Sequence, residues 1–237
     1  MASHSKRYVA SYKLVDKQKS YTAEEAVKLL KEKPGCEFDE SVDLHLRTGS
    51  DPKQSDQLVR GVVVLPHGRG KTIRVAVFAV GEAARIAREA NADYVGDEDL
   101  AKRVEGGWAD FEVALATADM MGRIGRLGRF LGRKGLMPNP RTGTVVQPQD
   151  LPRAINEARK GRIEFRMDRT AIIHCPLGKI GFEDQQLLEN LGALMDAINR
   201  AKPTTVKGQF IRTAFLTTTM GPSVKLDLSS MTALKAE

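Results

Sequence analysis

Two kinds of hydrophobic pattern alternate along the chain. Before Pro66 and again after Arg162, apolar and polar residues alternate with period two, as in residues 41–48. This alternation is typical of strands with one buried and one solvated face. Between these parts, residues 73–80 and 111–118 are nearly continuous apolar runs, which indicate strands covered on both faces. The pattern therefore predicts two different sheets.

Apolar residues at helical spacing predict the helices. Thr22 and Glu25 have the spacing of a capping box and open a helix that we expect Pro34 and Gly35 to end. The longest amphipathic stretch covers residues 183–202. Other helices are predicted over residues 7–17, 82–91, 97–104, 120–131 and 150–159.

The second half of the chain returns to alternating strands. Residues 162–167 and 170–175 flank Asp168 and Arg169 and predict a hairpin. Residues 209–219 and 223–228 predict two more strands, joined by a tight turn at Met220, Gly221 and Pro222.

The order of these elements predicts an α/β chain of two domains. An α+β domain is built from both ends, residues 1–67 and 160–237, and the βα alternation of residues 68–159 forms an inserted α/β domain with a largely parallel sheet. Two connections would join the domains as a double-stranded hinge near residues 66–70 and 160–161.

The charge of the chain favours an anionic partner. Its 37 Lys and Arg exceed its 30 Asp and Glu, which gives a net charge of +7. No apolar run approaches the ~20 residues of a membrane span, and the first residues lack the pattern of a secretory signal. We expect a cytoplasmic protein in which Cys36 and Cys175 are reduced thiols.

The densest positive charge lies between Gly122 and Gly143. This segment has six Arg or Lys residues, no acid, and a glycine every three or four positions up to Gly135. Glycine at that density weakens a helix. Any helix that forms would carry an uncompensated cationic stripe, which is either solvated or bound to an anion. The side chains concerned are Arg123, Arg126, Arg129, Arg133 and Lys134.

Motifs for enzymatic chemistry are missing. Residues 67–72, HGRGKT, resemble a phosphate loop but lack its first glycine and precede a strand instead of a helix. Gly81 is the single glycine after the apolar run that ends at Val80, so the dinucleotide fingerprint is absent. We expect no catalytic residues, no cofactor and no metal. A Rossmann-type, nucleotide-dependent enzyme and a sequence-specific DNA-binding protein remain as weaker alternatives.

Aromatic residues are scarce, at 5% of the chain, so stacking along a single strand is poorly supplied. This deficit favours a folded RNA or a duplex that is recognised by shape, phosphate and 2′-OH contacts. The run of three threonines that leads to Met220 and Gly221 fits such contacts. The alternative is a β-branched strand that runs into a turn.

Several segments resemble the bacterial ribosomal L-one stalk protein family over essentially the full length. The matching segments are FDESVDLH, SDQLVRGVVVLPHGRGK, ADYVG, GLMPNPRTGTV, KGRIEFRMD, IIHCPLGK, KGQFIRT and TTTMGPSV. The resemblance implies an α+β domain made of both termini and a Rossmann-like inserted domain on a hinge.

The resemblance also implies a function. Members of this family bind the rRNA of the mobile stalk of the large ribosomal subunit near the tRNA exit site, and stalk movement accompanies release of deacylated tRNA. Bacterial members also bind the messenger of their own operon and repress its translation. A chain of this kind would be a monomer when free, without a membrane or small-molecule partner.

Carried over by motif, the rRNA-binding residues lie mostly in the terminal domain. They would be Phe38, Thr217, Thr219, Met220 and Gly221, with Thr213 nearby and with Arg60, Arg166, His174, Lys179, Lys6 and Arg7 as further candidates. The cationic segment, with Arg123, Arg126, Arg129, Arg133 and Lys134, would make an auxiliary contact to RNA or tRNA.

The chain departs from the family pattern at three places. Glu37 stands where the family often has lysine, Leu58 where asparagine is usual, and Arg133 and Lys134 replace a common Pro-Arg pair. The last change makes the cationic segment more basic than the resemblance would predict.

Overall fold

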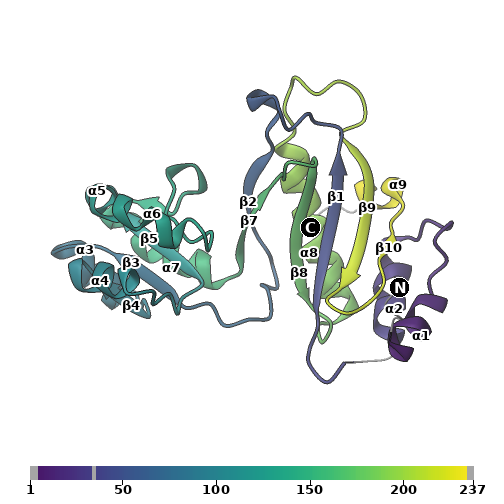
Figure 1. Ribbon diagram of the computed structural model, residues 1–237, viewed down its shortest axis with the longest axis horizontal. Coiled ribbons are helices and arrows are strands. Elements are labelled where there is room, and N and C mark those ends of the chain that lie inside the picture. The colour runs from purple at the N-terminus through teal and green to yellow at the C-terminus, as the bar shows by residue number, and fades with distance from the viewer. Residues whose placement is uncertain (1–4, 34–35, 234–237) are drawn as a thin grey trace. The chain divides into compact units, whose positions relative to one another are not determined.

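The computed structural model describes residues 5–33 and 36–233, which form two compact units. Unit 1 covers Met1–Gly70 and Ile163–Glu237, and unit 2 covers Lys71–Arg162 (Figure 1). The expected helix end at Pro34 and Gly35 lies outside the described residues. The division into an RNA-binding and an inserted domain, with limits at residues 67 and 160, stays a prediction.

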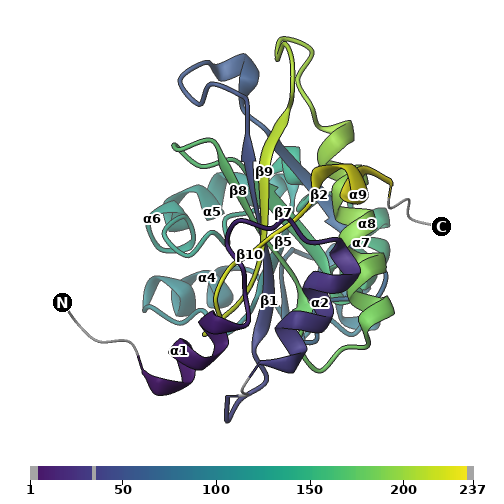
Figure 2. The ribbon, with the colours of Figure 1, turned by 90° about the vertical axis from the view of Figure 1, so that its right-hand side faces the viewer.

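Unit 1 is built on an antiparallel sheet with strand order β10-β9-β1-β8. Buried and partly exposed residues alternate along β1, as the period-two pattern predicted. Helices α2 and α8 lie side by side on one face of the sheet and enclose the core (Figure 2). These elements are β1 (Ser41–Thr48), β8 (Ile172–Lys179), β9 (Ile211–Thr218), β10 (Val224–Lys225), α2 (Ala23–Glu32) and α8 (Asp184–Arg200).

The helices of unit 1 follow the sequence signals closely. The capping box of α2 is present, because Thr22 Oγ1 accepts from Glu25 N at 3.3 Å while Glu25 Oε2 accepts from Thr22 N at 3.3 Å. Helix α1 (Lys6–Lys13) ends four residues before the predicted limit. Helix α9 (Leu228–Ala233) starts where a strand was predicted to end.

The predicted hairpin around Asp168 is wrong. Strand β7 (Arg162–Arg166) pairs with β2 (Arg60–Val64) in a separate two-stranded sheet, whereas β8 pairs with β1. In the described chain, a single antiparallel bridge between Met167 and Ile173 remains of the hairpin. The reason is that β8 pairs with β1 along nearly the whole length of β1.

Unit 2 contains a parallel sheet with strand order β4-β3-β5-β6. Helices α3 and α7 pack on one face of the sheet. Helix α4 packs on the other face together with the short helices α5 (Met121–Ile124) and α6 (Gly128–Leu131), so both apolar runs are buried as predicted. The elements are β3 (Val75–Phe78), β4 (Tyr94–Gly96), β5 (Val113–Thr117), β6 (Val145–Val146), α3 (Glu82–Glu89), α4 (Glu98–Glu105) and α7 (Leu151–Arg159). The chain is therefore of the mixed α/β class.

The helix predicted over residues 120–131 is not continuous. Helices α5 (Met121–Ile124) and α6 (Gly128–Leu131) are short and are joined by a 3-10 turn at Gly125–Leu127. Glycine loses more entropy on ordering than other residues, which explains the interrupted helix. Ile124, Leu127 and Leu131 are buried and hold the segment against the sheet.

Among the described residues, no helix has the length and apolar character that a membrane span needs.

Candidate nucleic-acid interface

One edge of the unit 1 sheet gathers several of the predicted RNA-binding residues. Strand β1 begins there while β8 and β9 end, since Ser41 pairs with Lys179 and Val42 pairs with Thr218. We call this region the turn edge and define it as Phe38, Ser41, Lys179 and Thr217 to Gly221. Phe38 and Met220 are 52% and 49% exposed, which is unusual for large apolar side chains.

Thr219 is fixed to the first residue of β1. Its N–H donates to Ser41 O at 3.1 Å, and its Oγ1 accepts from Ser41 N at 3.1 Å. A hydroxyl oxygen has two lone pairs, so Thr219 Oγ1 retains capacity to accept from a further donor. A ribose 2′-OH is a donor of this kind.

A buried ion pair holds the backbone of the turn. Glu40 Oε2 accepts from Met220 N at 2.9 Å, and Glu40 Oε1 contacts Lys33 Nζ at 2.5 Å. The two side chains are 1% and 4% exposed. Burial alone would raise the pKa of Glu40, but hydrogen bonds from Cys36, Lys33 and Met220 N–H outweigh it and bring the pKa to about 2. The carboxylate is therefore ionised at neutral pH.

Gly221 is required by close packing. A Cβ at this position would lie 2.3 Å from Thr218 Oγ1 and 3.2 Å from Lys33 Nζ. Gly221 N also donates to Thr218 O at 3.1 Å, which closes the turn. The turn is thus preorganised, because its backbone is tied to β1, to Glu40 and to itself.

The solvent face of the sheet carries a histidine pair beside Thr217. His45 Nδ1 lies 2.7 Å from His174 Nδ1, and His45 Nε2 lies 3.0 Å from Thr217 Oγ1. Burial and the neighbouring His174 lower the pKa of His45, and Asp43 opposes the shift. His174 also lies 3.6 Å from Asp168 Oδ2. The sequence analysis missed His45, because its partner is 129 positions away.

Not all predicted cations are free to bind RNA. Lys179 Nζ donates to Asp39 O at 3.0 Å and to Ser41 Oγ at 3.1 Å. Arg60 forms an ion pair with Glu164 at 2.5 Å on the β2-β7 sheet, where Arg166 is exposed. The turn edge therefore presents hydroxyls and apolar side chains more than charge.

The remaining predicted residues lie away from the turn. Thr213 pairs with Arg47 toward the other end of β9, about 20 Å from Thr219 at the usual rise per residue. Lys6 and Arg7 are exposed on α1. The structure brings together Lys179, Thr217, Thr219, Met220 and Gly221 at the start of β1, which Phe38 shortly precedes in the sequence. His174 joins them only through His45, which contacts both His174 and Thr217, and the other predicted residues lie apart.

The cationic segment of unit 2 is partly compensated, which corrects the expectation of a free stripe. Arg123 contacts Asp97 at 3.3 Å and Glu98 at 3.5 Å. Within the described residues, no ion pair involves Arg126, Arg129, Arg133 or Lys134, and all four are exposed. Four of the five predicted cations are therefore available to an anionic partner.

The loop that resembles a phosphate loop has a structural role. Asn190, which is fully buried on α8, accepts from His67 N at 3.1 Å and donates to Gly68 O at 3.2 Å and to Leu177 O at 2.8 Å. Glu189 contacts His67 Nε2 at 2.5 Å. These contacts fasten the loop to α8.

The chain is similar to known proteins over nearly its whole length. The sequence pattern of the family described as "Ribosomal protein L1p/L10e family" matches residues 27–222. The "Large ribosomal subunit protein uL1" of Thermomicrobium roseum is 56% identical over 231 residues, which are 97% of this chain and 96% of the relative. Proteins of the same name from Dehalococcoides mccartyi and Chloroflexus aggregans are each 52% identical, over 99% of this chain and 99% and 100% of their own lengths.

Proposed function

The chain belongs to the ribosomal protein L1p/L10e family, and we propose that it binds the rRNA of the mobile stalk of the large ribosomal subunit. Its relatives are named as proteins of the large ribosomal subunit, which supports a structural role in that particle. Membership of this family makes the chain a structural protein and not an enzyme, as the sequence analysis expected.

The observation that carries the proposal is the preorganised turn edge. Exposed Phe38 and Met220 belong to this edge together with the Thr219 hydroxyl, and Glu40 of the buried Lys33–Glu40 pair holds the backbone N–H of Met220. A rigid surface of hydroxyls and apolar groups with little free charge is suited to the shape and the 2′-OH groups of a folded RNA. Phosphate contacts elsewhere on unit 1 would add affinity without selecting the RNA.

We assign different roles to the two units. Unit 1 is the RNA-binding domain, with Phe38, Thr217, Thr219, Met220 and Gly221 at the contact. Unit 2 is an inserted domain on a double-stranded hinge. The cations of unit 2 make an auxiliary contact to RNA or tRNA. Through stalk movement the protein assists release of deacylated tRNA, and it binds the messenger of its own operon as a translational repressor. The free protein is a monomer.

The substitution Thr219→Val tests the contact. Valine keeps the β-branched shape and removes the hydroxyl, so we expect affinity for the stalk rRNA to fall by about 1–3 kcal/mol, because a polar group of the RNA loses its partner. A filter-binding titration of the full-length protein measures the loss. Thr204→Val makes the same change in an exposed loop of unit 1 and should leave affinity unaltered.

Unchanged affinity of Thr219→Val would remove the turn from the contact. Repression is tested separately, by translating a reporter that carries the leader of the chain's own operon with and without added protein. A reporter that is translated equally in both cases would exclude the repressor role.

A further inference from the structure

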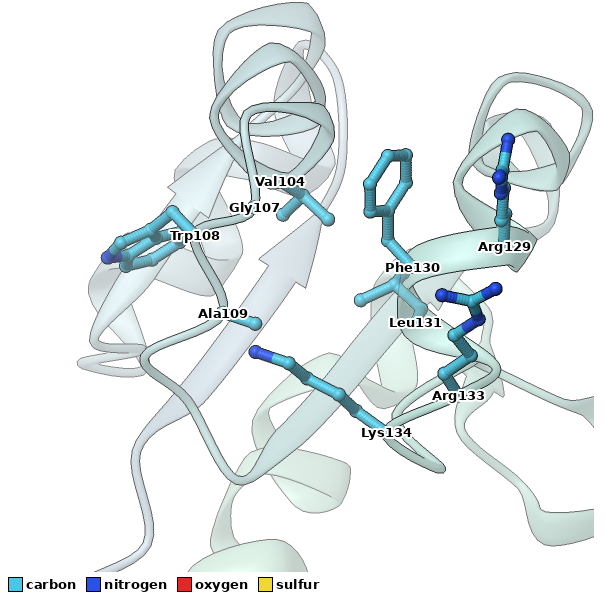
Figure 3. Close-up of a pocket in the computed structure, with 9 residues that line it drawn as sticks. All are labelled: Val104, Gly107, Trp108, Ala109, Arg129, Phe130, Leu131, Arg133 and Lys134. Atoms are coloured by element: carbon cyan, nitrogen blue, oxygen red, sulfur yellow. The ribbon is translucent and has the colours of Figure 1, made fainter.

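Unit 2 contains a pocket that combines an exposed aromatic ring with positive charge. It lies between α4 and α6 and has a volume of about 530 Å³ (Figure 3). Sites for small ligands usually measure about 300–1,000 Å³. Val104, Ala109 and Leu131 supply apolar lining, and Trp108 lies at one rim.

Phe130 is the side chain that internal packing does not explain. It is 41% exposed, whereas its neighbour Leu131 is fully buried in the core. Figure 3 shows the Phe130 ring directed into the space between Val104 and Arg129. An aromatic ring held at the surface of a pocket offers a free face on which a flat ligand can stack.

The charge around the ring is of one sign. Arg129, Arg133 and Lys134 line the pocket from the same segment, and Figure 3 shows Lys134 extending toward Ala109. Among the described residues, no acidic side chain lines this pocket, and none pairs with these three cations. The ligand that complements the pocket therefore has an aromatic part and at least one negative charge.

A second cavity of unit 2 does not have this character. It lies near the carboxyl ends of β3 and β4, where ligands usually bind in sheets of this class. Its lining includes four carboxylates, which disfavour a phosphate. They belong to Asp93, Asp97, Glu98 and Asp99.

We propose that the pocket between α4 and α6 binds one unpaired nucleotide of an RNA, with its base stacked on Phe130 and its phosphates near Arg129, Arg133 and Lys134. Bases that leave a helix are commonly stacked on aromatic side chains. The inference rests on the proposed function, because that function places the chain among RNA. It goes further by giving the auxiliary contact a ligand and a geometry.

The protein carries its own reporter for this test. Trp108 is the sole tryptophan of the chain and lines the pocket. Its indole is fixed by Tyr94, whose ring centroid is 4.8 Å away, and by the Arg103 guanidinium, 4.1 Å from the ring centroid. Binding in the pocket should therefore change the emission of Trp108, and no other tryptophan contributes to the signal.

The experiment titrates the full-length protein with an RNA hairpin that contains a single bulged adenosine. We expect quenching of Trp108 emission, and a dissociation constant that is about tenfold higher for Phe130→Ala than for the original protein, as for the loss of one base–aromatic stack. Phe130→Tyr keeps the ring and should restore binding. Because Phe130 lies outside the core, an unchanged melting temperature identifies a folded Phe130→Ala protein.

A charge control comes from the same segment. Arg133→Gln should weaken binding of the bulged hairpin. Arg126→Gln removes a cation that is also exposed and unpaired but does not line the pocket, so it should have a smaller effect. Equal effects of the two substitutions would mean that general charge attraction, and not the pocket, holds the RNA. The proposal would then be wrong.

Three further probes separate the proposed ligand from others. Equal quenching by a fully paired hairpin, or tighter binding of a peptide of glutamate and phenylalanine, would overturn the assignment to an unpaired nucleotide. Adenosine 5′-monophosphate that binds as tightly as the hairpin would assign the pocket to a free nucleotide and would overturn the assignment to RNA.

Failure here is distinguishable from failure of the proposed function. Thr219→Val should weaken binding of stalk rRNA and leave quenching by the bulged hairpin unchanged. A protein that binds stalk rRNA without any response at Trp108 or any effect of Phe130→Ala would refute the pocket alone. A protein that shows the quenching without affinity for stalk rRNA would refute the proposed function alone.

Discussion

The turn edge and the cationic segment differ in their charge and in how firmly their backbones are held. The turn from Thr217 to Gly221 has no charged residue, and its backbone is fixed to β1 and to Glu40. The segment from Gly122 to Gly143 has six cations and is divided into short helical pieces. Under the proposed function, the first surface would select an RNA by shape and the second would attract it by charge.

Under the proposed function, the region of densest charge is not the contact that selects the RNA. A preorganised donor or acceptor discriminates because a wrong partner leaves it unpaired at a cost of about 1–3 kcal/mol. A solvated arginine adjusts to many partners and is weakened by salt. The two regions should therefore respond differently to the same perturbations.

The largest effect is expected at the buried pair. Lys33→Met leaves the Glu40 carboxylate buried without its cation, which should cost about 3–5 kcal/mol of unfolding free energy. Lys28→Met, an exposed change on α2, the helix that Lys33 follows, should stay within about 0.5 kcal/mol. Urea titration of both variants measures the difference. Equal stabilities would show that the pair does not hold the turn.

Low pH should destabilise the turn edge, because Glu40 becomes protonated. The pKa of Glu40 is lowered to about 2 in the folded protein, so its contribution to stability is complete above the unfolded value of 4.5 and is lost as the pH falls toward 2. The contribution is at most about 3 kcal/mol at 1.36 kcal/mol per pKa unit. Melting temperatures between pH 6 and pH 2 should fall less steeply for Glu40→Gln, which has no titrating carboxylate at this site.

Glycine-to-alanine substitutions should change the stability of the protein in opposite directions in the two regions. Gly221→Ala forces a methyl group against Thr218 and should cost about 1–3 kcal/mol. Gly125 has a φ of −51°, and an added Cβ would meet nothing within 4 Å, so Gly125→Ala should stabilise the protein by about 0.4–1 kcal/mol. Thermal unfolding checks both. A stabilising Gly221→Ala would contradict the close packing of the turn.

The smallest effect concerns salt dependence. Replacing Arg126 with glutamine should reduce the slope of log affinity against log salt by about 0.7–0.9 if the residue contacts a phosphate. Thr219→Val should shift affinity equally at every salt concentration and leave the slope unchanged. Filter binding at several salt concentrations tests both. A changed slope for Thr219→Val would show that the turn acts through charge after all.

Local signals in the sequence predicted much of the fold. The capping box at Thr22 and Glu25 and the alternation along β1 depend on neighbours a few residues apart, and both were confirmed. The hairpin at Asp168 failed because β8 pairs with a strand that is distant in sequence. Partner choice among strands is a long-range property, and alternation alone does not encode it.

The candidate site was less accessible to prediction for the same reason. Thr219 and Gly221 were identified through resemblance to a family, not through periodicity. The groups that hold them, Lys33, Glu40 and Ser41, were missed because their contacts to the turn span about 180 positions. A lysine and a glutamate seven residues apart carry no signal of burial until the fold brings the turn onto them.

The strand order of unit 1 also has a consequence for synthesis on the ribosome. Strand β1 lies at the centre of its sheet, but both of its partners are encoded more than a hundred residues later, as the separation of 129 positions between His45 and His174 illustrates. At about 5–20 residues per second, a nascent β1 waits roughly 6–26 s for β8. The sheet of unit 2, in contrast, is complete within residues 75–146 and can form during that interval. The inserted unit can therefore fold first. During this time both edges of β1 stay unpaired, and β1 belongs to the unit that carries the turn.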